Sequence, residues 1–232
     1  MRFATPWSER VEEILDGDHA VVLAYATPAR GVVLAPVSNF GLHNRAEGVV
    51  TVNSSVGVEI RITVERIVVW PDLACQGAPE VEGVPLPAEV PASQERPAKG
   101  TAPRVNHARA ARRAKRLPNV LLGWVGVDGF PFVVPVNVGA TNDDGILLDS
   151  PPRTAPPGGR RAGLTAHWFS RGVAGQRHVI CTGWMESSGG EVTYAPHTLA
   201  AYRMPSSRLI YQFVVGLFTR LRYRQATNRG TG

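Results

Sequence analysis

The sequence predicts an α+β protein built from two related β-rich units, the first of them shortened, together with a few helices. Apolar, β-branched runs recur along the chain between turn residues rich in Gly, Pro, Asn and Asp. Hydrophobic residues make up 44% of the chain and charged residues 19%, which is typical of a folded globular protein. A shift of 99 positions also places one set of apolar runs on another. These three observations favour duplicated β structure.

The first unit is expected over residues 1–83. A helix begins at Thr5 and Pro6, which suit the cap and first helical positions, and it ends at Gly17. Strands are predicted over 20–25, 31–37 and 48–52. Residues 58–70 alternate between apolar and polar side chains, which predicts one long, half-buried strand.

The second unit is expected over residues 101–232, after a proline-rich linker over 84–100. Its first element is a basic helix over 103–117, with a small-residue face that could pack on the sheet. The strands predicted for this unit cover 120–127, 130–138, 146–148 and 179–185, and an amphipathic helix is predicted over 209–221.

The internal repeat relates the hairpin of residues 21–37 to that of residues 120–136. The shift of 99 positions places Tyr25 on Trp124 and Pro36 on Pro135, and a turn separates the two strands in each copy. The alternative is chance likeness, since any two hydrophobic hairpins share this pattern.

This hairpin, an apolar strand, a turn with glycine and a second strand that ends in small-Pro-Val, resembles the opening of pyridoxamine-phosphate-oxidase-like split β-barrels. The two copies resemble the branch of that family with both barrels on one chain. The resemblance implies two split-barrel-like units and an FMN, a deazaflavin or sometimes haem bound between them. It also implies a flavin- or deazaflavin-dependent oxidoreductase acting on a small molecule. Here Asn53 leads almost directly into the closing strand, so the first unit lacks the usual basic stretch and cofactor binding is expected to be weakened.

Candidate cofactor-binding residues are hydroxyls, arginines and an imidazole–indole pair. Ser54 and Ser55, and Arg160 and Arg161 beside a glycine pair, are suited to hold a phosphate. His167 could bond to a flavin ring or ligate haem iron, and Trp168 could stack on the ring. The structural alternatives are a solvated turn, an exposed loop, and core or rim side chains respectively. No catalytic residue is identified.

Other functions receive little support from the sequence. No hydrolase elbow, phosphate-binding loop or dinucleotide motif is present. The cysteines, Cys75 and Cys181, lack metal-ligand spacing, so neither a metal nor a disulfide is expected. No segment is apolar enough to predict a membrane span or a secretory signal, so a cytoplasmic protein is expected.

The net charge of +6 equals the charge of residues 104–116 alone, which contain six cations and no acid. These cations could attach the helix to nucleic acid, but no aromatic residue lies among them, so packing is favoured and a nucleic-acid partner is not expected. The chain could also be a non-enzymatic protein that has lost its cofactor. A homodimer is left open.

Overall fold

A computed structural model describes residues 5–17, 20–53, 59–72, 74–75, 77–170, 175–188 and 190–204 of the chain. Within these ranges it contains fourteen strands and two helices, so the predicted β-rich α+β class is confirmed. All strand pairs are antiparallel. Ser54, Ser55 and the helix expected over 209–221 lie outside the described residues.

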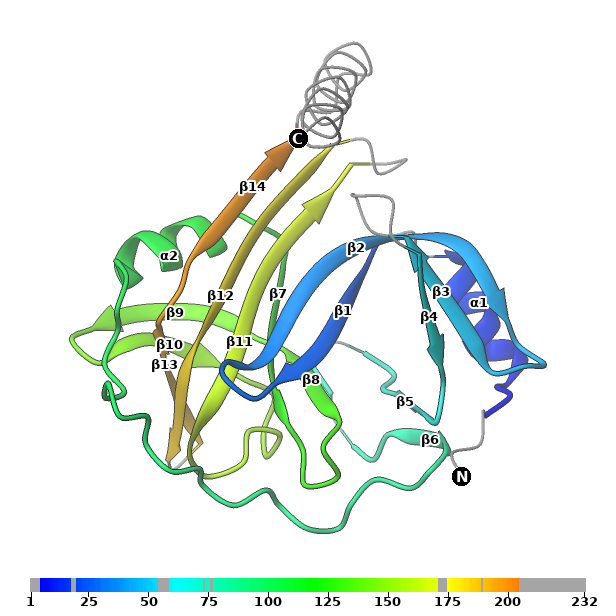
Figure 1. Ribbon diagram of the computed structural model, residues 1–232, viewed down its shortest axis with the longest axis horizontal. Helices are drawn as coiled ribbons and strands as arrows, with labels where there is room; N and C mark the ends of the chain where they lie inside the picture. The colour runs from blue at the N-terminus through cyan, green and yellow to red at the C-terminus, as the bar shows by residue number, and fades with distance from the viewer. Residues whose placement is uncertain are drawn as a thin grey trace, which may run out of the picture.

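The first part of the chain forms a short helix, a four-stranded sheet and a separate two-stranded sheet (Figure 1). Helix α1 (Glu9–Gly17) precedes a sheet in which the strands follow one another in chain order. These strands are β1 (Ala20–Thr27), β2 (Gly31–Asn44), β3 (Val49–Asn53) and β4 (Glu59–Thr63). β5 (Arg66–Val69) pairs with β6 (Glu80–Gly83).

The prediction of one long strand over 58–70 is wrong, because the strand is interrupted at Val64 and Glu65 and divided into β4 and β5. The carbonyl oxygen of Val64 accepts a hydrogen bond of 2.7 Å from the amide of Thr5, and its amide donates to the carbonyl of Gly48. The carbonyl of Glu65 accepts bonds from the Thr5 hydroxyl and the Val84 amide. The bond to Gly48 continues the β3–β4 register by one residue. Thr5 then binds the carbonyl oxygens of Val64 and Glu65 in place of a neighbouring strand, so the strand ends here.

The second part of the chain forms an eight-stranded sheet with one helix. Helix α2 (His107–Ala114) is followed by eight strands: β7 (Asn119–Val125), β8 (Pro131–Pro135), β9 (Asn137–Asn142), β10 (Gly145–Asp149), β11 (Gly158–Phe169), β12 (Gln176–Ser188), β13 (Glu191–Pro196) and β14 (Ala200–Met204). Their order is β8-β7-β11-β12-β13-β10-β9, and β14 pairs with β12. Only Val136 separates β8 from β9, so the chain of pairings returns on itself through one bent strand. We call this closed sheet the barrel.

The two hairpins of the expected repeat share one register. Val22 lies opposite Pro36 in the β1–β2 pair, and Leu121 lies opposite Pro135 in the β7–β8 pair. Each residue of the second pair lies 99 positions after the corresponding residue of the first pair. Their places in the sheets differ, since β7 also pairs with β11 whereas β1 ends its sheet within the described residues. The internal duplication therefore stays a prediction.

The β1–β2 hairpin packs on the outer face of the barrel, where β2 crosses β7, β11 and β12 (Figure 1). Val32 and Leu34 are fully buried in this contact. Glycine on the barrel side makes it possible: a Cβ at Gly163 would lie 2.4 Å from the carbonyl oxygen of Val32, and one at Gly123 would crowd Leu34.

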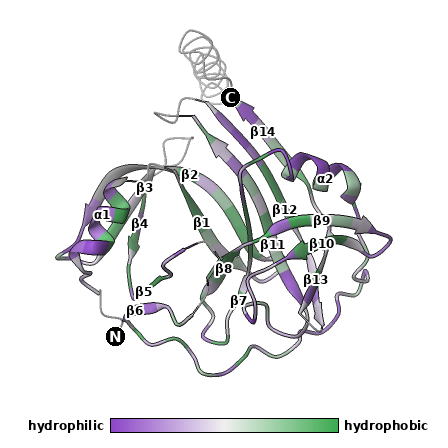
Figure 2. Ribbon diagram, turned by 180° about the vertical axis from the view of Figure 1, so that it is seen from behind, coloured by the Kyte–Doolittle hydropathy of each residue, from purple (hydrophilic) through white to green (hydrophobic). Residues whose placement is uncertain are grey.

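The main core fills the inside of the barrel, with Leu122, Val134, Ile146 and Tyr194 among its fully buried members. Helix α2 covers part of this core with Ala110, Ala111 and Ala114, each at most 3% exposed. The other side of α2 is hydrophilic (Figure 2). The predicted basic helix and its small-residue face are thus present. The helix is shorter than expected at both ends, because Asn106 caps it and the chain turns after Ala114.

Candidate functional site

A cavity lies where the β7–β8 turn, the start of β5 and the proline-rich segment meet. Its volume is about 470 Å³. We call it the Trp124 pocket, and its lining residues are Arg66, Leu86, Pro87, Glu89, Val90, Pro91, Trp124, Gly126, Val127, Asp128, Phe130, Pro131, Phe132, Arg153, Thr154, Ala155, Pro156 and Pro157. Aromatic rings and prolines dominate these walls.

Aromatic packing makes one wall of the pocket rigid. The rings of Trp124 and Phe132 lie 5.4 Å apart, and Trp70 meets Phe132 edge-on at 6.1 Å. Trp124 is buried and belongs to the barrel core, so the wall is an extension of that core. The strand alternation of β7 turns Trp124 to the same side as Leu122.

The rim of the pocket exposes large apolar side chains to water. Val90 is 61% exposed, Val127 44% and Phe130 37%. Single exposed apolar residues are ordinary on a protein surface, but several around one concavity mark a place where another molecule binds. A second hollow, of about 410 Å³ near the bend between β8 and β9, has no exposed large hydrophobic among its lining residues.

An ion pair lies at the edge of the pocket. Arg66 Nη1 donates to Asp128 Oδ2 at 2.6 Å, and its Nε donates to the carbonyl oxygen of Val84 at 2.7 Å. The guanidinium also lies 5.7 Å from the centre of the Phe130 ring. Burial alone would raise the pKa of Asp128, but hydrogen bonds from Arg66 and the Phe130 amide outweigh it and lower that pKa.

Arg153 is the cation that remains available to a ligand in this pocket. Its φ is +62°, in the left-handed region that non-glycine residues seldom adopt. Its side chain is exposed and makes no hydrogen bond or ion pair with any residue that the structure describes. Residues in sparsely populated backbone conformations cluster at ligand sites, where the surrounding structure holds them in place.

One wall of the pocket belongs to residues 84–94, which we call the strap. The strap contains no helix or strand, in agreement with the predicted linker, but it is held firmly to the start of β11. The Gln94 amide donates to Gly159 O at 2.7 Å, and the Gly159 amide donates to Ser93 Oγ at 2.9 Å. The strap is therefore a fixed wall.

Arg160 ties the strap to the opposite wall of the pocket. Its side chain is 1% exposed. Nη1 donates to Pro91 O at 3.0 Å and Nη2 to Pro157 O at 2.6 Å, and both acceptors belong to residues that line the pocket. Burial lowers the pKa of Arg160, and the nearby Glu186 carboxylate opposes that shift. Arg160 thus holds two walls of the pocket in place, although it is not one of the lining residues.

The structure does not gather the described members of the expected cofactor set into one site. Residues 158–161 belong to strand β11, so Arg160 and Arg161 point to opposite faces. Arg161 Nη1 donates to Ala29 O at 2.8 Å in the β1–β2 turn. Trp168 lies further along β11, where its ring faces the Arg177 guanidinium at 5.6 Å. A cofactor role for these residues stays a prediction.

His167 lies directly opposite His178 on β12, on the same face of the sheet. Phe169 contacts both imidazoles, with ring centres 5.9 and 5.0 Å away. Burial, and then the neighbouring His167, lower the pKa of His178 to about 4. His178 is therefore neutral near pH 7, and its Nε2 has no hydrogen-bond partner among the described residues.

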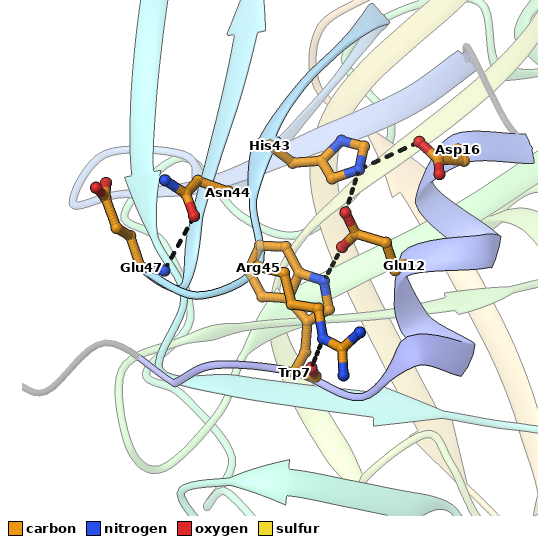
Figure 3. Close-up of polar contacts among 7 residues, drawn as sticks. All are labelled: Trp7, Glu12, Asp16, His43, Asn44, Arg45 and Glu47. Atoms are coloured by element: carbon orange, nitrogen blue, oxygen red, sulfur yellow. Dashed lines mark hydrogen bonds and ion pairs between the residues drawn. The ribbon is translucent and has the colours of Figure 1, made fainter.

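A separate polar cluster joins α1 to β2 (Figure 3). His43 Nε2 lies 3.1 Å from Glu12 Oε1 and 3.3 Å from Asp16 Oδ1, two carboxylates one helical turn apart. The other oxygen of Glu12 accepts a hydrogen bond from Trp7 Nε1, and Arg45 donates to Trp7 O. Neither cavity is lined by these residues, so we interpret the cluster as a tie that holds α1 on the sheet.

Sequence reasoning missed most of the Trp124 pocket. In the sequence, Asp128 lies between two apolar runs, as a turn residue does, and neither Arg66 nor Arg153 belongs to a recognisable motif. The single signal was the accumulation of prolines at 85–91 and 151–157. Proline-rich segments lack ladder hydrogen bonds, so they border cavities between regular elements more readily than they fill them.

No family model, curated protein or solved structure matches the chain. Among the described residues, no group of three or more His, Cys, Asp or Glu side chains is arranged to hold a metal ion. The described helices include none with the length and apolar character to cross a membrane. Within the described residues, fold and site together define a β-rich protein that has an aromatic, apolar-rimmed pocket.

Proposed function

We propose that the protein binds a flavin or deazaflavin in the Trp124 pocket and uses it in a redox reaction on a small molecule. The observation that carries this proposal is the apolar rim of Val90, Val127 and Phe130 around a cavity of about 470 Å³. A largely apolar cavity with a few polar groups is the usual form of a small-molecule site. Covering this rim would remove apolar surface from water, which stabilises the bound state.

The residues present suit such a molecule. Trp124, Phe130 and Phe132 offer flat, apolar surface for a ring system, and Arg153 offers a guanidinium for a phosphate or carboxylate tail. A bound flavin would supply electron or hydride transfer. The chain's own residues would hold the ring, exclude water from one side of it and neutralise the anionic tail.

The closed path of strand pairings adds support from the fold. The ring contains six strands when β8 and β9 are counted as one bent strand and β14 is left out. A ring of six strands agrees with the expected split-barrel likeness of the second unit. The cofactor position proposed here differs from that of Arg161, His167 and Trp168 in the expected set, and Ser54 and Ser55 lie outside the described residues. Arg160 of that set retains a role, as the residue that positions the pocket walls.

Titration of the purified full chain with FMN, followed by flavin fluorescence, tests the proposal. We expect saturable quenching with a dissociation constant in the micromolar range, on the order of −8 kcal/mol. Phe130→Ala should weaken binding about tenfold, because it removes an exposed ring that a ligand would cover. Tyr25→Ala, which removes another exposed aromatic away from the pocket, is the matched control.

The rival function, a protein that has lost its cofactor, predicts a different outcome. FMN, riboflavin and a deazaflavin would then all fail to bind at concentrations up to about 1 mM, about −4 kcal/mol. Equal losses for Phe130→Ala and Tyr25→Ala would show that the flavin binds outside the Trp124 pocket. Thermal melting of each variant confirms that the fold is retained.

A further inference from the structure

Of the cations in and beside α2, Arg109 and Arg112 lie on the side of the helix away from its buried alanines. Residues 104–116 carry Arg104, Arg109, Arg112, Arg113, Lys115 and Arg116. All are exposed except Arg113, which is partly buried. From the sequence, packing on the sheet and attachment to a polyanion are alternative roles for this helix. In the structure the two roles would use different sides of it. The buried alanines therefore leave the charges in solvent.

No acid on the described chain neutralises these charges. None of the six cations forms an ion pair with a described residue, and Arg104 donates only to the carbonyl oxygen of Gly100, at 2.9 Å. The sequence contains no Asp or Glu from position 96 to position 127. Like charges on one short helix repel one another, so a polyanion that binds them relieves that repulsion.

We propose that this face of α2 binds the phosphate backbone of double-stranded nucleic acid without reading its sequence. Five of the six cations are arginines, whose planar guanidinium matches the geometry of phosphate oxygens. Arg109 and Arg112 are three residues apart within α2, so they lie along one side of the helix axis. The helix is about 12 Å long, and a duplex presents several phosphates over that length.

Two other polyanions suit this surface less well. A single strand is usually held by stacking on aromatic rings, and residues 104–116 contain no aromatic side chain apart from the imidazole of His107. An anionic membrane favours a helix that also inserts apolar side chains. No large hydrophobic side chain is exposed between Val90 and Val127. This surface is separate from the Trp124 pocket, so the inference does not depend on the proposed function.

Fluorescence anisotropy of a labelled 20-base-pair DNA of arbitrary sequence tests the proposal with the full chain. The logarithm of the association constant should fall with the logarithm of salt concentration with a slope of about −4, as expected for four to five phosphate contacts. Arg109→Gln with Arg112→Gln should reduce the slope by about two and weaken binding at least tenfold at low salt. Glutamine keeps a helix propensity close to that of arginine.

The control is Arg30→Gln with Arg177→Gln, which changes the net charge equally but on β1–β2 and β12. This pair should bind duplex DNA like the natural chain, and thermal melting should show all proteins folded. Equal weakening by both pairs would overturn the proposal, because net charge alone would explain it. Absence of duplex binding at low salt would also overturn it, as would tighter binding to a single strand or to phosphatidylserine vesicles.

Discussion

The Arg160 guanidinium donates a 2.6 Å hydrogen bond to the carbonyl oxygen of Pro157, across a turn that closes the Trp124 pocket. The same guanidinium reaches Pro91 O in the strap, so two segments 66 positions apart in sequence share one buried cation. Proline-rich segments offer carbonyl oxygens but few amides, and a buried arginine satisfies several such acceptors at once. The pocket walls therefore depend on one side chain that no ligand would touch.

Replacing Arg160 with leucine should destabilise the protein by about 2–4 kcal/mol, because buried carbonyl oxygens of the strap lose their donors. For a chain of this length each kcal/mol lowers the melting temperature by roughly 2–4 °C. Arg161→Leu removes a more exposed hydrogen bond to Ala29 and should cost about 1 kcal/mol or less. Chemical denaturation of both variants checks this, and equal losses would contradict the role given to Arg160.

The packing of β2 on the barrel should fail when Gly163 gains a side chain. A Cβ there would lie 2.4 Å from the backbone oxygen of Val32, which cannot rotate away. We expect Gly163→Ala to cost about 2 kcal/mol or more, measured by urea denaturation. Gly129→Ala is the control: it meets no atom but has a φ of +82°, so only a backbone cost of about 1 kcal/mol is expected. A smaller loss of unfolding free energy for Gly163→Ala than for Gly129→Ala would rule out this close packing.

Acid should weaken the fold through His178. Its pKa is about 4 in the folded protein and about 6.5 when exposed, so the unfolded chain binds the proton first as pH falls. Its contribution to stability is complete above pH 6.5 and is lost between pH 6.5 and 4, by about 3 kcal/mol at most. The natural chain and His178→Gln should be unfolded with urea at pH 7.5 and pH 4.5. A pH dependence of the same size in both would assign it to other groups.

The β-rich class could be predicted because alternation and β-branched runs are local properties of the chain. The break between β4 and β5 could not, because Thr5, which binds the carbonyl oxygens of Val64 and Glu65 there, lies far away in sequence. The turns of both hairpins were predicted, since each lies between two apolar runs, but β2 continues to Asn44, beyond the predicted end at residue 37. Strand boundaries near long-range hydrogen bonds need the tertiary structure.

The candidate site illustrates the same limit. The pair Arg160 and Arg161 was interpreted as a phosphate-binding loop because two glycines precede it, but those glycines begin a strand that separates the two side chains. The Trp124 pocket combines Arg66, the strap, the β7–β8 turn and Arg153, which are brought together only by folding. Sequence composition marked the proline-rich segments but could not show that they face aromatic rings.

The proposed ligand site makes Arg153 responsible for an anionic group. Arg153 lines the pocket, is exposed and has no described partner, so its charge is available without breaking another contact. FMN and riboflavin share a ring system and differ by a phosphate, which allows the ring and charge contributions to be separated. Arg153→Ala should weaken FMN binding about ten- to hundredfold, equivalent to about 1.5–3 kcal/mol for a charge-assisted hydrogen bond.

Riboflavin binding should change less than threefold in the same variant, because the apolar walls remain. The second variant is Arg153→Gly, because glycine adopts the left-handed conformation of Arg153 without strain and should leave the loop undisturbed. It should give the same selective loss of FMN binding. Arg177→Ala, a change of equal charge outside the pocket, is the control. If FMN and riboflavin weakened together in Arg153→Gly, the arginine would act on the pocket's shape, and recognition of the phosphate by its guanidinium would be wrong.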